Sequence, residues 1–276
     1  MVFRSAGTLY FIFSMPYHIT LPCFFHSFFF LLILVNMTPN FAHIYQNVSE
    51  VLDKIQACAE MNHRHAAEIE LEIAIKTRSA TEALHAGLAL EASGRRALLA
   101  HNRVQEAQAT TPILRDGPLS SFHSVLIGNL QRNKINAAVR VFDEIESVDS
   151  LALARALSQR LDPTEQLPIM LQVNTSRELS KSGLVPEVAL ETALEIADLP
   201  GLLVTGFMTI GAHTTDQALI GKSFANLRAI RDEAIKHPSL KKAINLSMGM
   251  SSDFELAIAE GSTRIRIGNA VFGPRL

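Results

Sequence analysis

The sequence has no tryptophan and only two cysteines, Cys23 and Cys58, among its 276 residues. The cysteines form no Cys-x-x-Cys pair and show no metal-ligand spacing. This pattern argues against structural zinc and disulfides, and we expect a reducing, cytoplasmic setting. A basic excess is also missing, because the formal net charge is −2. Without such an excess a chain cannot neutralise a row of phosphates, so we do not expect nucleic acid as a partner.

Charge is nearly absent from the first 40 residues, where Arg4 is the only charged side chain and eight of the fifteen phenylalanines lie. Residues 24–35 form the apolar run FFHSFFFLLILV. A membrane span needs about 20 apolar residues, and Pro22 and His26 shorten or interrupt this stretch. A secretory signal would end in a small-residue cleavage motif, and none follows the run.

Three interpretations of residues 1–36 therefore remain open: a membrane anchor, a secretory signal and an upstream start codon. We favour the third, in which Met37 begins the protein, and we do not expect a membrane partner. The predicted domain organisation is an apolar extension over residues 1–36 and a single domain over residues 37–276.

From residue 47 onward, short apolar runs alternate with longer stretches of helical spacing. Runs bounded by Gly, Pro or Ser are typical of parallel strands buried on both faces. The runs are 71–75, 96–102, 124–128, 144–148, 168–174, 201–210, 243–249 and 264–268. Eight strand–helix alternations predict a single (β/α)8 barrel of the TIM type. An open doubly wound sheet is the alternative, but no Gly-x-Gly-x-x-Gly follows the first strand.

Only eight residues, 269–276, follow the last predicted strand, and a helix that covers a barrel strand needs more. The segment VSEVLDKIQACAEM before the first strand is amphipathic, with Val48, Val51 and Ile55 on one face together with Leu52 and Ala59. We expect this leading helix to cover the gap beside strand eight.

Lys76 directly follows the first predicted strand, so its side chain is expected at the mouth of the barrel, where this fold places its chemistry. An amine enclosed by apolar residues loses hydration, which favours the neutral form that reacts with aldehydes to give a Schiff base. Position alone equally fits an ordinary solvated lysine at a strand end.

A phosphate-binding site is expected after strands seven and eight. Ser252 and Glu255 are spaced as a capping box at the start of a helix, with Ser251 beside them. Free N–H groups at a helix start, next to the loop at Gly268 and Asn269, can bind phosphate without a lysine. The alternative is that the two serines merely cap the helix.

Arg266 alternates with Ile265 and Ile267 on the last predicted strand, which puts its side chain inside the barrel mouth or in the core. A buried arginine needs a partner, and a phosphate or a pyridine nitrogen would provide one.

Eight motifs, one near each strand end and in family order, give the chain a resemblance to the pyridoxal phosphate homeostasis proteins. They are IKTRS, HNRVQEA, LIGNLQRNK, VDS, QVNTSRELSKSGL, GFMTIGA, LSMGMSSDFELAIAEGST and RIRIGNAVFG, within residues 47–276. The resemblance implies the barrel of the alanine racemase N-terminal domain with pyridoxal 5'-phosphate (PLP) as cofactor.

The resemblance also implies roles for individual residues. Lys76 would hold PLP as a Schiff base, Asn102 would lie beside the ring, and Arg266 would face the pyridine nitrogen. The phosphate would be held by Ser251, Gly268 and Asn269. An arginine at the ring nitrogen discourages its protonation and weakens the ring as an electron sink, which suits a carrier better than a transaminase.

Four positions depart from the family pattern. Ile75 stands where Ser or Thr commonly precedes the lysine, and His101 replaces Glu before the asparagine. Val125 stands where the family has His, although His123 lies two residues earlier. Asn269 replaces Thr, and because Asn can still donate to phosphate we expect binding with altered affinity.

Two functions from different classes remain. The first is a non-catalytic protein of intracellular PLP homeostasis, whose partners are PLP and apo PLP-dependent enzymes or free amino acids. The second is an amino-acid racemase, which needs two positioned acid–base groups. Racemases of the alanine type resemble this barrel but add a β-domain and a catalytic tyrosine. The only tyrosines in this sequence are Tyr10, Tyr17 and Tyr45, and we expect no second domain. We favour the carrier; a Schiff-base aldolase is weaker, because strand six lacks a lysine.

Overall fold

The computed structural model describes residues 41–273 except residues 121 and 163. The expectation for residues 1–36 lies outside the described residues. The strands are β1 Glu70–Ala74, β2 Ala97–His101, β3 Phe122–Leu126, β4 Glu144–Val148, β5 Leu167–Gln172, β6 Leu202–Met208, β7 Asn245–Ser247 and β8 Arg264–Ile267. The helices are α2 Ala42–Met61, α3 Ala80–Ala92, α4 Val104–Arg115, α5 Ile135–Val141, α6 Leu151–Ser158, α7 Pro186–Ala197, α8 Gln217–Ala234, α9 Phe254–Ala259 and α10 Asn269–Phe272.

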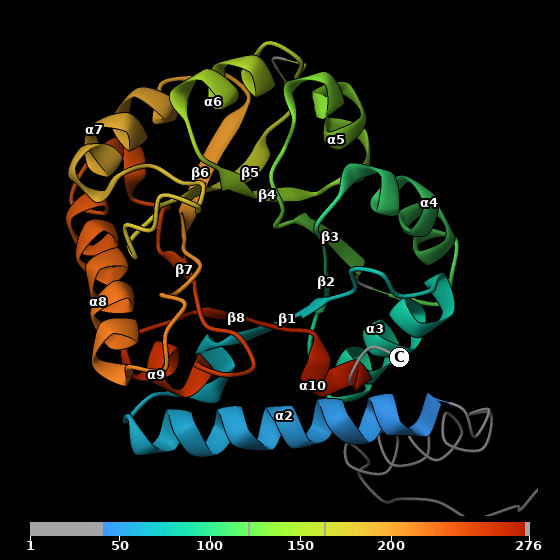
Figure 1. Cartoon of the computed structure of the whole chain (residues 1–276). Helices are drawn as coiled ribbons and strands as arrows, with labels where there is room; N and C mark the ends of the chain where they lie inside the picture. The colour runs from blue at the N-terminus through green and yellow to red at the C-terminus, as the bar shows by residue number, and fades with distance from the viewer. Residues whose placement is uncertain (1–40, 121, 163, 274–276) are drawn as a thin grey trace, which may run out of the picture. The chain divides into compact units, whose positions relative to one another are not determined.

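The eight strands form one closed parallel barrel in chain order, and the helices surround it (Figure 1). This architecture confirms the predicted (β/α)8 barrel. Every strand lies within its predicted run or overlaps it. The largest difference is β7, which has three residues where seven were expected. The chain leaves the barrel early there, and Gly249 adopts a positive φ of 96° just beyond the strand.

The apolar core lies between the barrel and its helices, where outward-facing strand residues such as Ile73, Ile145 and Ile169 are fully buried. Strand residues alternate between the two faces, so the other set points into the barrel. On β1, β4 and β8 that inward set is charged: Glu70, Glu72, Glu144, Glu146, Arg264 and Arg266. The middle of this barrel is therefore ionic, unlike the branched apolar layers common in the fold.

Helix α2 covers the barrel beside β8, as predicted for the leading helix. Its buried side chains include Val48, Val51 and Ile55, and it packs against α10, α3 and α9 (Figure 1). The short α10 alone could not shield β8 and β1 from water. Among the described helices, none is long and apolar enough to cross a membrane.

Candidate functional site

Lys76 lies half-buried at the mouth of the barrel, two residues beyond the end of β1. The N–H of Ile75 donates to the carbonyl of Ala100 at 2.9 Å, which extends the β1–β2 pairing up to the lysine. The chain then turns sharply at Thr77, whose φ of 61° is a left-handed conformation that a β-branched residue rarely adopts. Such a residue is held by its surroundings at a cost of about 1–3 kcal/mol.

Arg78 holds this turn against the loop that follows β8. Its guanidinium donates to the carbonyl of Gly273 at 3.2 Å and lies 4.9 Å from the centre of the Phe272 ring. A salt bridge of 3.3 Å to Glu82 completes its contacts. The loops after β1 and β8 therefore form one packed unit.

Gly268 follows β8 and lies beside Ala74. A Cβ at Gly268 would approach the carbonyl oxygen of Ala74 to 3.3 Å, so a side chain would crowd the wall just below Lys76. Asn269 is exposed and begins α10. The hydrogen bonds formed among the described residues leave the N–H of Asn269 and of Ala270 without a partner. Two free donors therefore point out of this helix start.

Asn102 follows β2 and is the neighbour of Lys76, because Ala74 pairs with Ala100. Its side-chain oxygen Oδ1 is buried and has no hydrogen-bond partner among the described residues. Behind it, a Cβ at Gly128 would overlap the backbone carbonyl of Asn102. This glycine, two residues beyond the end of β3, thus allows Asn102 to take this position.

Ser251 and Ser252 are exposed in the loop between β7 and α9. The predicted capping box at Ser252 and Glu255 is wrong. Helix α9 begins at Phe254 with Asp253 at its N-cap, and Asp253 Oδ1 accepts from the N–H of Met250 at 2.6 Å. The aspartate closes the loop from within, which leaves both serine hydroxyls at the surface of the mouth.

Arg266 lies inside the barrel below the mouth and is 5% exposed. Its Nη1 donates to Ser247 Oγ at 2.6 Å and its Nη2 to the carbonyl of Thr209 at 2.7 Å. Of the two places that the strand alternation left open for Arg266, the structure shows the barrel interior. The protein supplies two partners, so the guanidinium keeps further N–H groups for a ligand.

Arg264 lies one layer deeper and binds several carboxylates. Its guanidinium contacts Glu146 at 2.5 Å, Glu144 at 3.0 Å and Glu70 at 2.6 Å. Burial alone would lower the pKa of Arg264, but these anions raise it well above its ordinary value. This side chain stays charged and joins β1, β4 and β8 across the barrel.

The acids around Arg264 differ in their protonation. Burial would raise the pKa of Glu144, but the hydrogen bond from His123 and the charge of Arg264 lower it to about 2. Burial, followed by the charge of Glu146, raises the pKa of Glu72 well above its ordinary value. Glu72 has no hydrogen-bond partner among the described residues, which fits a neutral acid.

Two departures from the family pattern lie away from the mouth. His101 points to the helix side of β2, where its ring centroid is 6.0 Å from that of Phe142 and burial lowers its pKa to about 4. Val125 lies inside the barrel against Leu98 and Ala100. His123, which we noted near it, donates from Nε2 to the carboxylate of Glu144 at 3.2 Å.

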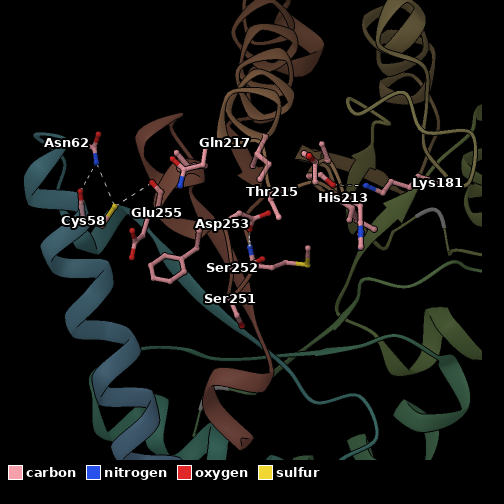
Figure 2. Close-up of a pocket in the computed structure, with 18 of the residues that line it drawn as sticks. Cys58, Asn62, Lys181, His213, Thr215, Gln217, Ser251, Ser252, Asp253 and Glu255 are labelled. Atoms are coloured by element: carbon pink, nitrogen blue, oxygen red, sulfur yellow. Dashed lines mark hydrogen bonds between the residues drawn. The ribbon is translucent and has the colours of Figure 1, made fainter. Parts of the chain in front are cut away.

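A groove of about 1190 Å³ runs outward from the Ser251 loop (Figure 2). It lies between α2, α9 and the segment that joins β6 to α8, and Lys181 and Asn62 line its two ends. Of the six predicted site residues, Ser251 alone lines it. Among the described residues no cluster of three or more His, Cys, Asp or Glu is placed to bind a metal ion.

Sequence reasoning brought Lys76, Asn102, Arg266 and the two loops to one mouth, but it missed the ionic interior. The signal was present, because Glu, Arg and Ser alternate with Ile or Leu in ELEIA, EIESV, NLS and RIRI. Charged residues at every second position of a strand that is buried on both faces indicate a polar barrel interior.

Comparisons with known proteins agree with this geometry. Residues 51–275 match the family model described as the alanine racemase N-terminal domain. The pyridoxal phosphate homeostasis protein of Pseudomonas aeruginosa is 37% identical over 234 residues, 84% of this chain and 96% of that protein. The chain therefore belongs to the alanine racemase N-terminal domain family and, within it, to the pyridoxal phosphate homeostasis proteins.

Two solved structures share the fold at substantial identity. PipY of Synechococcus elongatus, solved with PLP bound, has a TM-score of 0.68 and 31% identity, over 83% of this chain and all of that one. A protein of unknown function from Bifidobacterium adolescentis has a TM-score of 0.79 and 38% identity, over 86% and 97% of the two chains.

Replacing Glu144 by Gln should reduce stability in a pH-dependent way. The pKa of Glu144 falls from 4.5 to about 2 on folding, so its contribution is present above pH 4.5 and is lost as the pH falls toward 2. We expect a loss on the order of 3 kcal/mol at pH 7 that shrinks toward pH 3. Urea unfolding at several pH values measures this difference.

The matched control is Glu195→Gln, which breaks an exposed pair with Arg155 and should cost less than about 1 kcal/mol. A Glu144→Gln loss that stays constant between pH 7 and pH 3 would contradict the assignment.

Proposed function

We propose that this chain binds PLP at the barrel mouth, holds it as a Schiff base on Lys76, and serves intracellular PLP homeostasis without ordinary turnover. The observation that carries the proposal is the convergence of Lys76, the unpartnered Asn102 oxygen and two loops with free N–H groups at one mouth. The names of the relatives and the PLP in the PipY structure support the same ligand.

The residues at the mouth fit PLP in chemistry. Bound PLP supplies an aldehyde that reacts reversibly with amines. Lys76 is the amine at the end of β1, and Asn102 offers a buried acceptor beside it. Because no side chain fills the space at Gly268, a phosphate could approach the backbone there.

The phosphate is assigned to the loops after β7 and β8. Ser251 offers an exposed hydroxyl, and Gly268 and Asn269 offer backbone donors at the start of α10. Neutral donors of this kind bind phosphate through directed hydrogen bonds. Arg266, held in the interior, is assigned to the pyridine nitrogen.

A carrier fits the mouth better than a racemase, which remains the alternative. Racemisation needs a second acid–base group opposite Lys76. Tyr45 lies in α2 and bonds to His85 at 3.4 Å, so it is not at the mouth. Lys181 is already bound to Glu178 and to the carbonyl of Gly211, both at 2.7 Å. Lys76 is left as the available base among the described residues of the mouth.

The proposal extends to partners and location. An accessible Schiff base exchanges with other amines, so free amino acids or the active-site lysine of an apo-enzyme are the proposed recipients. A cytoplasmic location is proposed because Cys58 is a buried free thiol and the chain shows no disulfide spacing.

Replacing Lys76 by Ala tests the covalent attachment. The wild-type protein mixed with PLP should show an absorbance band at the violet edge of the visible range. Borohydride should abolish that band and leave a phosphopyridoxyl group on the Lys76 peptide. The Lys76→Ala protein should show neither, whereas Lys181→Ala, which changes a second lysine at the mouth, should retain both. A band that persists in Lys76→Ala would show that another lysine carries PLP.

Replacing Ser251 by Ala tests the phosphate site. Loss of a hydrogen bond to a charged group should weaken PLP binding by roughly 1–3 kcal/mol. Pyridoxal, which lacks the phosphate, should bind poorly and respond little to the change. Titration calorimetry with both ligands measures this, and Ser252→Ala is the adjacent control. Equal losses for PLP and pyridoxal would mean that Ser251 supports the fold instead.

Incubation of the PLP-loaded protein with single L-amino acids in deuterated water tests for turnover. We expect spectral changes as amines exchange with Lys76, but no appreciable α-proton exchange or racemisation. Missing acid–base help is worth about 10²–10⁴-fold in rate. Exchange faster than about 1 per second that disappears in Lys76→Ala would favour the racemase.

A further inference from the structure

Arg266 is connected to the ionic interior by one serine hydroxyl. Ser247 Oγ donates to Glu146 Oε2 at 2.5 Å, and Arg266 Nη1 donates to Ser247 Oγ at 2.6 Å. Because a hydroxyl has a single proton, the bond to Glu146 fixes Ser247 as the acceptor for Arg266. Glu146 in turn accepts from Arg264 at 2.5 Å through its other oxygen. Two hydrogen bonds therefore connect Arg266 to Glu146 through Ser247.

The three side chains linked by these hydrogen bonds are shielded from water. Glu146 and Ser247 are fully buried and Arg266 is 5% exposed. Hydrogen bonds to charged groups in such surroundings are stronger than in water and set a side chain's orientation. The second anchor of Arg266, the carbonyl of Thr209, belongs to the backbone and does not depend on side-chain identity.

The buried glutamates of the interior differ in their contacts with the two arginines. The buried ionisable groups include two arginines, Arg264 and Arg266, and three glutamates. The pKa of Glu72 is raised by burial and by Glu146, which favours its neutral form. Glu144 contacts Arg264, whereas Glu146 contacts Arg264 directly and Arg266 through Ser247. Ser247 is the link through which the charge of Arg266 is compensated.

We infer that Ser247 and Glu146 are positioning residues that hold the Arg266 guanidinium in the orientation in which it recognises a pyridine nitrogen. This inference rests on the proposed PLP site and adds to it the residues that make Arg266 selective. Neither residue reaches the ligand; both act through Arg266.

The test compares PLP with 1-deazapyridoxal 5'-phosphate, in which a C–H group replaces the pyridine nitrogen. Both ligands have the aldehyde and the phosphate, so their affinity ratio reports the contact at the ring nitrogen. Wild type should prefer PLP. In Ser247→Ala the preference should fall by on the order of tenfold, the value of a lost hydrogen bond to a charged group.

Ser262→Ala is the matched control. Ser262 is also fully buried and lies close to β7 and β8, but the acceptors within reach of its hydroxyl are backbone carbonyls, those of Met248 at 2.8 Å and Arg264 at 2.9 Å. The two variants should lose similar thermal stability, and only Ser247→Ala should lose the preference. Glu146→Gln, which keeps the shape and removes the charge, should reduce the preference as well and serves if Ser247→Ala does not fold.

The outcomes separate the two claims. A preference that is unchanged in both Ser247→Ala and Glu146→Gln would overturn the positioning role while leaving PLP binding intact. A wild-type protein that binds both ligands equally would also overturn it, because Arg266 would then make no contact with the nitrogen. A wild-type protein that binds neither ligand would instead refute the proposed function, and the inference with it.

Discussion

The pairing of β8 with β1 closes the barrel, and the proposed site depends on that closure. Glu70 pairs with Arg264 and Glu72 with Arg266 across this seam, so it places an acidic residue opposite each arginine. The same seam brings Gly268 beside Ala74 and places the β8 loop next to Lys76. A barrel left open here would separate the amine from the phosphate donors proposed at Gly268 and Asn269.

An ionic interior has a cost as well as a use. Buried charges lose hydration, and their attraction compensates only when the geometry is good and all donors are satisfied. Arg264 meets this condition with several carboxylates, whereas Glu72 lacks a hydrogen-bond partner among the described residues, and burial raises its pKa. In return, the interior anchors Arg266 through Ser247 directly below the mouth proposed to bind PLP.

The fold could be predicted because its signals are local. Apolar runs bounded by Gly, Pro or Ser marked the strands, and the amphipathic face of Val48 and Ile55 marked the helix that covers β8. The helix cap at Ser252 was predicted wrongly, because the helix begins two residues later, at Phe254, and the carboxylate of Asp253 before it accepts from Met250 within the loop. The link from Ser247 to Glu146 spans 101 residues, and spacing along the chain carries no signal for such a contact.

Gly128 shows how a position can be essential without taking part in chemistry. A side chain at Gly128 would overlap the backbone carbonyl of Asn102. Asn102 directly follows β2, the strand that pairs with β3. In a saturation mutagenesis experiment this position would be among the least tolerant of the barrel, although glycine has no side chain to bind anything. The intolerance would measure the closeness of two backbones, and a variant that lost PLP there would have lost the placement of Asn102 rather than a ligand contact.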